Sequence, residues 1–291
     1  MAIDIGLPQM DLERFGLEDL PTVAAQVRDA GFSGCMSDYQ GESVEMAKRL
    51  LRLAAGFSVA PISGFQVGAV AVGQSGKLYL GANMEFIGVP LSSSLHAEQS
   101  AVLNAWYHGE ERIESLVVSA APCGHCRQFL WELPGAFELQ VLFEDKVYEL
   151  ANLLPDAFGS GRSLGHSLLD GSAYTLESIR PAGSELSKQA IDAAKRSYTP
   201  YTQAPEGIAL GCVDGKSFIG RTAESIAFNP TVPAIVSALN RRNFSHSRKD
   251  AIAAVAHAKL ATSLGSQLDF TRSLIKRISN LKIGSIALER V

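Results

Sequence analysis

A repeated pattern limits the fold of this 291-residue chain more than any other feature of its sequence. Residues 77–85 read KLYLGANME and residues 216–224 read KSFIGRTAE, with the lysine, the central glycine and the final glutamate at the same spacing. Glu224 thus takes the place of Glu85 in the second copy. Because a unit that is present twice is expected to fold twice, we predict two lobes of similar architecture.

The repeat continues beyond this segment, but the second copy loses polar residues. After a small deletion, residues 101–104 (AVLN) match residues 237–240 (SALN). This alignment sets two polar residues of the first copy against apolar residues of the second, His96 against Val232 and Glu98 against Ala234. The CxxC of the first copy has no counterpart in the second half either. The second copy is therefore predicted to keep the scaffold and to lack the chemistry.

The spacing of apolar residues predicts helices and strands that alternate along the chain. The elements expected in the first copy are a helix over 43–55, strands over 65–72 and 77–80, a helix after the serines at 92–94, a strand over 113–121, a helix from Pro122 and a strand over 140–144. The second copy repeats this order with a helix over 187–197, strands over 207–213 and 216–220, a short helix through 235–239, a strand over 251–258, a helix over 269–278 and a strand over 283–288. This order predicts an α/β fold in which helices pack on the faces of mixed sheets.

Composition along the chain suggests four parts. Residues 1–42 are predicted to be an N-terminal helical extension. Residues 43–153 are predicted to be the domain that carries His96, Glu98 and the CxxC and is therefore the catalytic one. Residues 154–183 contain the turn-forming composition of a linker. Residues 184–291 form the degenerate copy.

The overall composition disfavours several classes of protein. The chain is 46% hydrophobic and 19% charged, which suits a packed core. Its formal net charge of −4 argues against a nucleic-acid polymer as partner, because such binders carry a basic excess. The uncharged stretch 53–76 is interrupted by glycine and proline, so it does not predict a membrane-spanning helix. Acidic residues near the N-terminus do not fit a signal peptide, and we expect a soluble, cytosolic protein without a membrane partner.

Cysteine usage points to a metal ion. The four cysteines are too few and too scattered for a disulfide framework. Cys123 and Cys126, with His96 upstream, offer two thiolates and an imidazole, which is a ligand set that suits Zn²⁺. Three protein ligands leave a fourth position for water, whose pKa the metal lowers to roughly 7. We therefore predict one catalytic zinc ion per chain, with a structural site closed by His125 and a redox CxxC as the alternatives.

Glu98 follows His96 by two residues, and both are expected in the first turn of a helix. Residues two apart on a helix point about 200° away from each other. Glu98 is therefore predicted to reach over the metal-bound water, take its proton and return it to the substrate. The simpler alternative is an acid on the helix surface.

The residues HAE (96–98) followed by PCGHC (122–126) match the H-x-E…P-C-x-x-C pattern of zinc-dependent nucleobase deaminases. With its surroundings, the pattern closely resembles cytidine deaminase, in particular the long, two-domain, homodimeric type. The further matching segments are FQVGA (65–69), GANME (81–85), PCGHCRQF (122–129), LPDAFG (154–159) and FNPTVP (228–233). The resemblance covers most of the chain and implies two three-layer lobes, each a mixed five-stranded sheet packed with helices, the second of them degenerate.

The resemblance also implies roles for single residues. Asn83 and Glu85 match residues that hold the ribose hydroxyls, and Phe65 matches one that packs against the pyrimidine. Ala97 matches a residue whose backbone contacts the base, and Phe158 an aromatic residue that closes an active site across the subunit boundary. Without the resemblance, the simpler interpretation of Asn83 is a turn residue and that of Glu85 is a solvated acid. Phe65 would be a core residue, and Phe158 would pack against the linker.

The implied reaction is the hydrolytic deamination of cytidine and deoxycytidine to uridine and deoxyuridine plus ammonia, in pyrimidine salvage. Zinc-bound hydroxide attacks C4, and Glu98 protonates N3 and then the leaving amino group. No organic cofactor is needed. The expected partners are a free nucleoside, water and a second copy of the chain in a homodimer.

Two other functions stay open. A deaminase of polynucleotides would use the same zinc chemistry but needs a basic groove, which the acidic balance disfavours. A non-catalytic scaffold with structural zinc is the second. Among neighbouring residues, Arg127 is predicted to support a zinc thiolate, and the neutral Gln99 suits a neutral histidine ligand. His257, in an HAK echo of HAE, is predicted to be structural.

Overall fold

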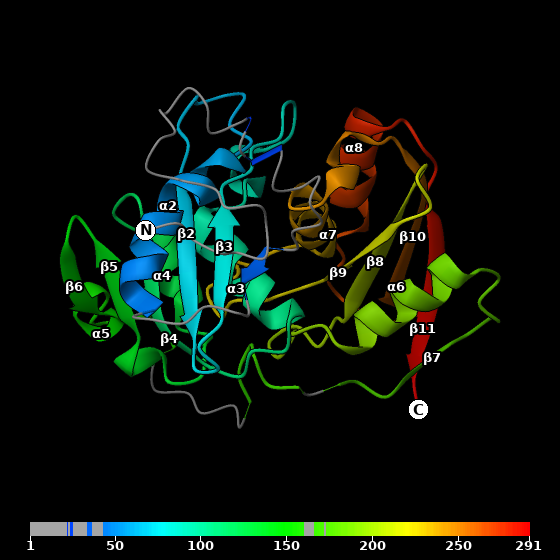
Figure 1. The fold of residues 1–291 in the computed structure, drawn as a ribbon. Coiled ribbons are helices and arrows are strands. Elements are labelled where there is room, and N and C mark those ends of the chain that lie inside the picture. Colours follow the sequence, from blue (N-terminus) through cyan, green and yellow to red (C-terminus); the bar gives the residue numbers. More distant parts are fainter. Residues whose placement is uncertain (1–21, 23, 26–33, 37–42, 160–165, 172) are drawn as a thin grey trace.

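The computed structural model describes residues 22, 24–25, 34–36, 43–159, 166–171 and 173–291. These residues form two lobes, which Figure 1 shows next to each other, one in blue to green and the other in yellow to red. Each lobe has a mixed sheet with helices on both faces, so the predicted α/β fold with two three-layer lobes is confirmed. Most of the predicted helical extension 1–42 lies outside the described residues. Of this range, Thr22, Ala24 and Ala25 are helical.

The sheet of the first lobe has the strand order β1-β3-β2-β4-β5-β6. The strands are β1 (Cys35–Met36), β2 (Gly68–Gly73), β3 (Leu78–Ala82), β4 (Ile113–Val118), β5 (Gln140–Phe143) and β6 (Lys146–Glu149). β4 and β5 are parallel and the other neighbours are antiparallel. Strands β2 to β6 form the expected five-stranded mixed sheet, and β1 adds a sixth strand from the N-terminal part that the sequence pattern did not predict.

Helices cover both faces of this sheet. α2 (Ser43–Gly56) packs on one face, and α3 (Ala97–Tyr107) and α4 (Gly124–Leu130) pack on the other. Two glycines allow the close approach, since a Cβ on Gly68 would lie 2.3 Å from the Leu51 carbonyl of α2, and one on Gly81 would lie 2.2 Å from the Ala97 carbonyl of α3. The short elements of this lobe are η2 (Leu91–Ser93), η3 (Ala136–Glu138) and α5 (Leu150–Leu153).

The second lobe has the strand order β7-β11-β10-β8-β9, with β10 and β11 parallel. Its elements are β7 (Leu176–Ser178), α6 (Glu185–Lys195), β8 (Glu206–Cys212), β9 (Ser217–Arg221), α7 (Ala234–Asn243), η4 (His246–Lys249), β10 (Ile252–Leu260), α8 (Leu268–Ile278) and β11 (Gly284–Arg290). β7 lies inside the range predicted as a linker and pairs with β11, in the place that β6 has beside β5. The edge of the second sheet is thus formed by chain that precedes the lobe.

The backbone pairing corrects the predicted alignment of the two copies by one residue. Met84 is bridged to Leu95, and its counterpart Ala223 is bridged to Val232. Val232 therefore takes the place of Leu95, not of His96. The connection between the bridged residues is two residues shorter in the second copy (224–231 against 85–94), where the sequence alignment assumed three. Pro233 then matches His96 and Ile235 matches Glu98, so the loss of both polar groups stands.

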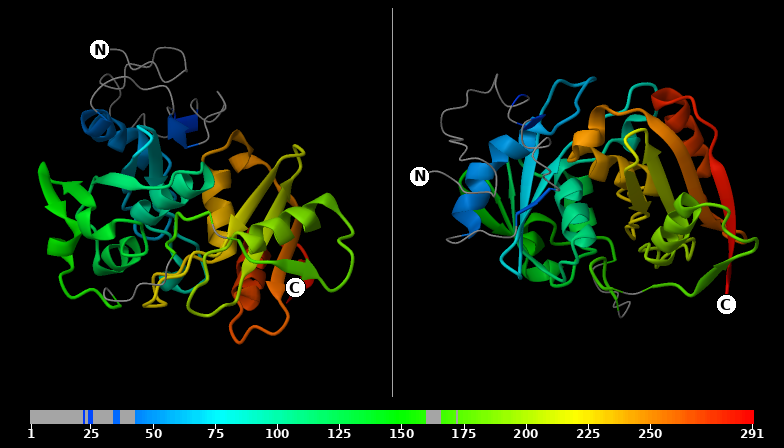
Figure 2. Two further views of the ribbon diagram at one scale, coloured as in Figure 1. Left: turned by 90° about the horizontal axis from the view of Figure 1, so that it is seen from below. Right: turned by 45° about the vertical axis from the view of Figure 1, so that its right-hand side comes forward.

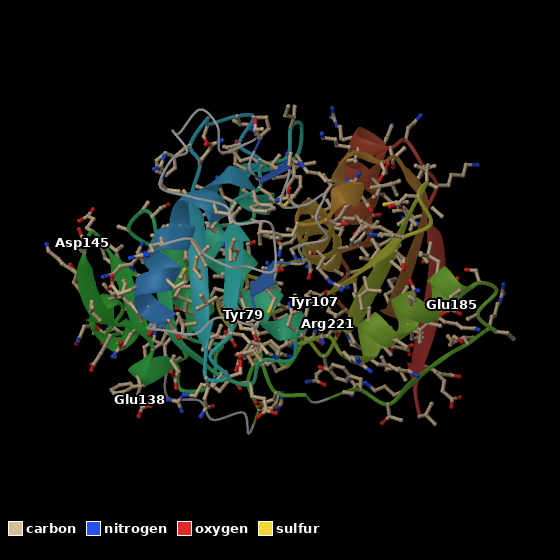
Figure 3. The ribbon with its side chains drawn as sticks, viewed as in Figure 1. Tyr79, Tyr107, Glu138, Asp145, Glu185 and Arg221 are labelled. Atoms are coloured by element: carbon tan, nitrogen blue, oxygen red, sulfur yellow. The ribbon has the colours of Figure 1, made fainter. Side chains whose placement is uncertain are left out.

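Helices α3 and α7 lie between the two sheets, where the lobes meet (Figure 1 and Figure 2). One hydrophobic core runs through both lobes at this seam. The Arg221 guanidinium lies 3.9 Å from the ring centroid of Trp106, and its backbone N–H donates to the Tyr107 hydroxyl at 2.7 Å (Figure 3). Ser100 on α3 donates to the Asn240 side chain on α7 at 2.6 Å. The two lobes therefore form one body.

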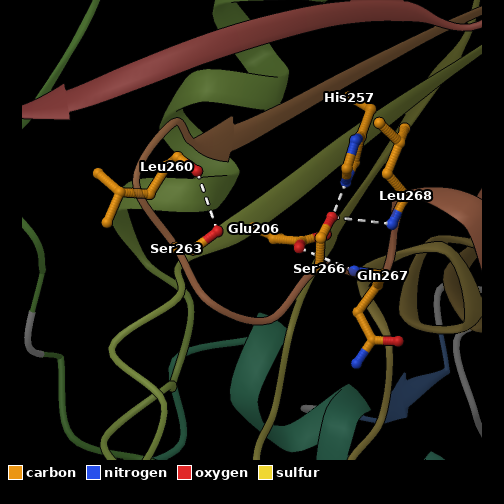
Figure 4. A network of polar contacts seen from close by, with 7 residues as sticks. All are labelled: Glu206, His257, Leu260, Ser263, Ser266, Gln267 and Leu268. Atoms are coloured by element: carbon orange, nitrogen blue, oxygen red, sulfur yellow. Dashed lines mark hydrogen bonds and ion pairs between the residues drawn. The ribbon is translucent and has the colours of Figure 1, made fainter.

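His257 lies on β10, away from the CxxC, in a polar network of the second lobe (Figure 4). Its Nε2 is 2.8 Å from a carboxylate oxygen of Glu206, and both side chains are buried. The other oxygen of Glu206 accepts the backbone N–H of Gln267 at 2.8 Å. This pair fixes the segment before α8, as expected for a structural histidine. Of the helices that are described, none is long and apolar enough to cross a membrane.

Candidate active site

Three predicted metal ligands meet where two helices begin. His96 is the residue just before α3 and has an extended backbone (φ −88°, ψ 156°), so it lies outside the first helical turn in which it was predicted. Cys123 is the corresponding residue before α4, and Cys126 lies in the first turn of that helix. His96 and Glu98 are therefore set apart because α3 begins between them, and not because of the rotation of about 200° predicted within one helix.

The ligand atoms of His96, Cys123 and Cys126 lie within 4.8 Å of one another. The two Sγ atoms are 3.7 Å apart, and the His96 Nδ1 is 3.5 Å from one and 3.2 Å from the other. A tetrahedral zinc ion with bonds of about 2.3 Å to sulfur and about 2.0–2.1 Å to nitrogen requires S···S separations of about 3.8 Å and N···S separations of about 3.5–3.6 Å. The cluster therefore fits zinc with little adjustment.

The thiols of the metal-free cluster share protons unequally. A hydrogen bond from Cys126 lowers the pKa of Cys123 to about 3. The same hydrogen bond, together with burial, raises the pKa of Cys126 well above its ordinary value. The hydrogen bond between Cys123 and His96 raises the pKa of the imidazole. A metal ion that binds both sulfurs must therefore displace the proton of Cys126.

The alternative of a structural zinc site closed by His125 finds little support in the geometry. His125 stacks beside His96 with ring centroids 4.9 Å apart, and the cluster found among the described residues has three members without it. A structural zinc site would need that fourth ligand. Cys123 and Cys126 are both free thiols. The arrangement leaves one position of a tetrahedral metal ion open.

Glu98 lies on the first turn of α3 and is buried, with 4% of its surface exposed. It is outside the ligand cluster but lines the same cavity. Burial raises the pKa of its carboxyl above the ordinary value, although a hydrogen bond from its own backbone N–H, the charge of His96 and a hydrogen bond with Cys126 lower it. Such a carboxyl can hold a proton at a pH at which an exposed glutamate has lost it.

A cavity of about 460 Å³ opens beside the ligand cluster, within the usual size range of small-molecule sites. Seven of the nine predicted site residues line it, namely Phe65, Asn83, Glu85, His96, Ala97, Glu98 and Cys123. Cys126 is fully buried behind them. Phe158 is not in the lining. Its ring is 64% exposed, and its backbone is held by two hydrogen bonds with the Gln128 side chain.

Asn83 and Glu85 face the cavity and also hold the loop beside it. The Asn83 amide accepts from Ser58 at 2.6 Å and from the Val67 N–H at 2.9 Å, and donates to the Phe65 carbonyl at 2.9 Å. The sequence predicted both residues as ribose ligands. Their contacts within the chain show that each also shapes the wall.

Glu85 accepts hydrogen bonds from the backbone N–H of Ile62 at 2.8 Å, the N–H of Ser63 at 3.0 Å and the Ser63 hydroxyl. The second lobe repeats this arrangement at Glu224, which accepts from the N–H of Tyr201, the N–H of Thr202 and the Thr202 hydroxyl. The hydrogen bond from Ser63 lowers the pKa of Glu85. The carboxylate therefore fixes a loop in both lobes, with or without the metal ligands.

Two residues of the first lobe connect the site to the second lobe through contacts that the sequence pattern did not predict. Gln99 accepts the His96 N–H at 3.2 Å and donates to the Pro230 carbonyl at 2.8 Å. Glu132, two residues after the end of α4, accepts hydrogen bonds from Tyr198 and Tyr201. A carboxylate that follows an apolar helix gives no sequence signal for such a role, because its donors lie more than 60 residues away.

Arg127 differs from its predicted role as a donor to a zinc thiolate. Its Nε donates to the Pro122 carbonyl at 2.9 Å, and its Nη1 donates to the Leu153 carbonyl at 2.8 Å. Arg127 therefore fixes the backbone just before Cys123 instead. The reason is its place near the end of the first turn of α4, from which the guanidinium reaches back to the carbonyls.

Two segments of the chain, residues 42–137 and residues 150–272, match the cytidine and deoxycytidylate deaminase zinc-binding region. The chain is 40% identical over 248 residues to a cytidine deaminase of Proteus mirabilis (strain HI4320), which covers 84% of this chain and 83% of that protein. It is 44% identical over 199 residues to a cytidine deaminase of Enterobacter sp. (strain 638), which covers 67% of this chain and 66% of that protein. The crystal structure of cytidine deaminase from Mycobacterium tuberculosis aligns with 41% of this chain and 99% of its own, at 32% identity and a TM-score of 0.38. With two matching regions and 40% identity over most of both proteins, this chain belongs to the cytidine and deoxycytidylate deaminase family.

Proposed function

We propose that this chain catalyses the zinc-dependent hydrolytic deamination of cytidine and deoxycytidine to the uridine counterparts and ammonia. The observation that carries the proposal is a three-ligand cluster with tetrahedral spacing, placed beside a buried glutamate and a cavity of about 460 Å³. His96, Cys123 and Cys126 would hold the zinc ion. When bound, zinc supplies an activated water at its open position.

Glu98 moves the protons of this reaction. The carboxylate takes a proton from the attacking water and gives it to N3 of the pyrimidine, as C4 becomes tetrahedral. It then takes the proton of the hydroxyl now on C4 and passes it to the amino group, which leaves as ammonia as the C4–N bond breaks and the C4 carbonyl forms. Burial raises the pKa of this carboxyl, which favours its protonated form over that of an exposed glutamate and suits a group that must return the proton.

A free nucleoside fits this cavity better than a polymer or a nucleotide. Glu85 lines the cavity as a carboxylate, which would repel a phosphate group. The basic groove that single-stranded nucleic acid needs is missing from the described cavity lining, which contains no arginine or lysine. The polynucleotide deaminase thus remains the weaker candidate.

The test uses purified protein with measured zinc content. Deamination of cytidine, cytidine monophosphate and single-stranded DNA is followed by ultraviolet absorbance. Glu98→Gln is expected to keep zinc and to lose activity by at least about 10²-fold, as for the loss of a general acid–base group. His96→Ala is expected to lose both zinc and activity. Glu114→Gln, an exposed residue on β4, is the control and is expected to change neither.

Three results would contradict the proposal. Turnover of the polymer without turnover of the nucleoside would favour the editing enzyme. Stoichiometric zinc with four protein ligands and no turnover would favour the scaffold. Full activity of Glu98→Gln would remove the carboxylate from the mechanism.

A homodimer is also part of the proposal. Phe158 is exposed and outside the cavity of its own chain, which leaves its ring free to contact a second copy. A scattering mass for the active protein tests this, and an active monomer would overturn it. Cytosolic location is proposed because the paired thiols of the ligand cluster need a reducing compartment.

A further inference from the structure

A second cavity lies between the lobes, on the other side of the loop that borders the candidate active site. Its volume is about 320 Å³. Pro61 lines this cavity, while the next residues, Ile62 and Ser63, line the catalytic one. Glu85 lines both, so the loop and its carboxylate form the partition between the two spaces. The opposite wall comes from α7, η4 and α8, which face the loop after β3 in Figures 1 and 2.

Three arginines of the second lobe line this cavity. Arg242 on α7 is partly buried and donates to the carbonyls of Arg248 and Asp250 at 2.7 and 2.5 Å. Its Nε is buried without a hydrogen-bond partner in the described part of the chain. Arg277, in the last turn of α8, reaches across to Gly88 of the first lobe. The contact is so close that a Cβ atom added to Gly88 would lie 2.8 Å from the Nη1 of Arg277.

Within the described chain, these guanidinium groups have no ion-pair partner. Among the described residues, no carboxylate forms an ion pair with Arg242, Arg248 or Arg277, and the last two donate no side-chain hydrogen bond. Glu85 is the acid in the lining, and its carboxylate is occupied by the loop. Burial and the charge of Arg242 lower the pKa of Arg248, as expected for cations held together without an anion.

Apart from Asn243, the remaining wall of the cavity is apolar. Leu239 and Leu274 line it from the second lobe, and Phe86 and Ile87 from the first. Three guanidinium groups against one carboxylate suit a dianionic phosphate, which arginine binds with paired, charge-assisted hydrogen bonds. The apolar wall suits a hydrophobic body attached to that phosphate.

We propose that this inter-lobe cavity is a binding site for a small organic phosphate, distinct from the catalytic site. Arg248 and Arg277 bind the phosphate, and the side chains around Leu274 cover the organic part. Because Glu85 and the loop at 61–63 separate the two cavities, a ligand here shifts the apparent affinity for the nucleoside. By linkage, the nucleoside shifts the affinity for the phosphate by the same factor.

Calorimetry on the zinc-loaded full chain tests the site, with phenyl phosphate as the probe and inorganic phosphate as the comparison. Saturating uridine is present in a parallel titration to fill the catalytic cavity. Arg248→Gln and Arg277→Gln are each expected to weaken phenyl phosphate binding by about tenfold, the loss of one charge-assisted contact. Arg272→Gln, on the same helix but paired with Asp269 outside the cavity, is expected to leave it unchanged. Added salt should weaken binding as well.

Each outcome decides the proposal. The proposal is supported if phenyl phosphate binds at one site per chain, binds more weakly to both cavity variants, and still binds when uridine is present. It is also supported if phenyl phosphate changes the KM for cytidine and Arg248→Gln abolishes this change. Absence of binding, an equal loss in Arg272→Gln, or complete displacement by uridine overturns it. Equal affinity for inorganic and phenyl phosphate overturns the role of the apolar wall. An unchanged KM at saturating phenyl phosphate overturns the coupling. Arg277 is exposed, so its variant keeps the test valid if Arg248→Gln does not fold.

Discussion

Glu132 is the residue by which the first lobe is most directly tied to the second. Its two carboxylate oxygens accept from the Tyr198 hydroxyl at 2.9 Å, the Tyr201 hydroxyl at 2.5 Å and the Ile226 N–H at 2.8 Å. Glu132 is 4% exposed and Tyr198 5%. Replacing Glu132 by alanine would leave three donors of the second lobe without their acceptor.

The expected loss follows from this count. A buried donor that loses its partner costs about 1–3 kcal/mol. Tyr201 is half-buried and can turn to water, so its loss is at the low end of that range. Glu132→Ala is therefore expected to lower the free energy of unfolding by about 3–7 kcal/mol, the sum over the three donors. That is a large part of the total stability of an ordinary domain, which is about 5–15 kcal/mol.

The chain offers its own probes for the measurement. Trp131 precedes Glu132, Trp106 lies at the seam between the lobes, and these are the two tryptophans of the sequence. Urea unfolding followed by tryptophan fluorescence should give a lower midpoint at an unchanged slope. Tyr198→Phe is expected to cost about 1 kcal/mol, and the double variant should be less destabilised than the sum of the two single variants.

Glu138→Ala is the matched control. Glu138, labelled in Figure 3, is also an acid of the first lobe, but it is exposed and forms an ion pair with Arg112. Exposed ion pairs contribute about 0–1 kcal/mol. If Glu132→Ala were as mild as this control, or if its effect were simply additive with that of Tyr198→Phe, the three hydrogen bonds would not hold the lobes together.

Three further variants or treatments test other parts of the structure. Gly81→Ala should destabilise the chain by about 1–3 kcal/mol because the new Cβ would meet the backbone of α3, whereas Gly171→Ala, with open space around it, should not; thermal unfolding distinguishes the two. Burial raises the pKa of Glu224, so the wild-type protein should lose stability relative to Glu224→Gln as the pH rises from about 4 through that raised pKa. Denaturation at a series of pH values measures this, and a difference in stability that stayed constant with pH would contradict it. In zinc-free protein, iodoacetamide should modify the exposed Cys123 before the buried Cys126, and zinc should protect both; mass spectrometry would refute the cluster if zinc changed neither rate.

Much of the fold was predictable because its signals are local. The helix from position 43 and the strand predicted over 65–72, which the structure places at Gly68–Gly73, follow from the apolar residues within one segment, and the turn at 73–76 follows from its glycines. β7 was not predictable in this way. It has three residues, and its pairing with β11 depends on chain more than 100 residues away. The shift of one residue in the alignment of the copies has a similar cause, since the shared letters AVLN and SALN favoured a match that the bridge at Val232 excludes.

The same distinction between local signals and distant contacts applies to the candidate site. The ligands His96, Cys123 and Cys126 could be predicted from the sequence, because zinc binds these residue types and the two cysteines have the spacing of a zinc-binding CxxC. The hydrogen bonds of Gln99 and Glu132 to the second lobe were not, because amides and carboxylates occur at many surface positions without such partners. Arg127 was placed correctly beside the site, but its donors reach backbone carbonyls, and backbone acceptors leave no pattern in the sequence.

Comparison of the two lobes separates scaffold from chemistry within one chain. The second lobe keeps the loop contacts of Glu85 at Glu224, although it has lost the metal ligands. A carboxylate at this position is therefore needed for the loop, and reduced activity of a Glu85 variant would not by itself prove contact with the ribose. Asn83 differs, because its counterpart Thr222 keeps the backbone pairing while its hydroxyl has no hydrogen-bond partner in the described structure. The amide of Asn83, which holds the Phe65 carbonyl, is thus specific to the lobe with the metal ligands, and it is the stronger candidate for a role beyond the scaffold.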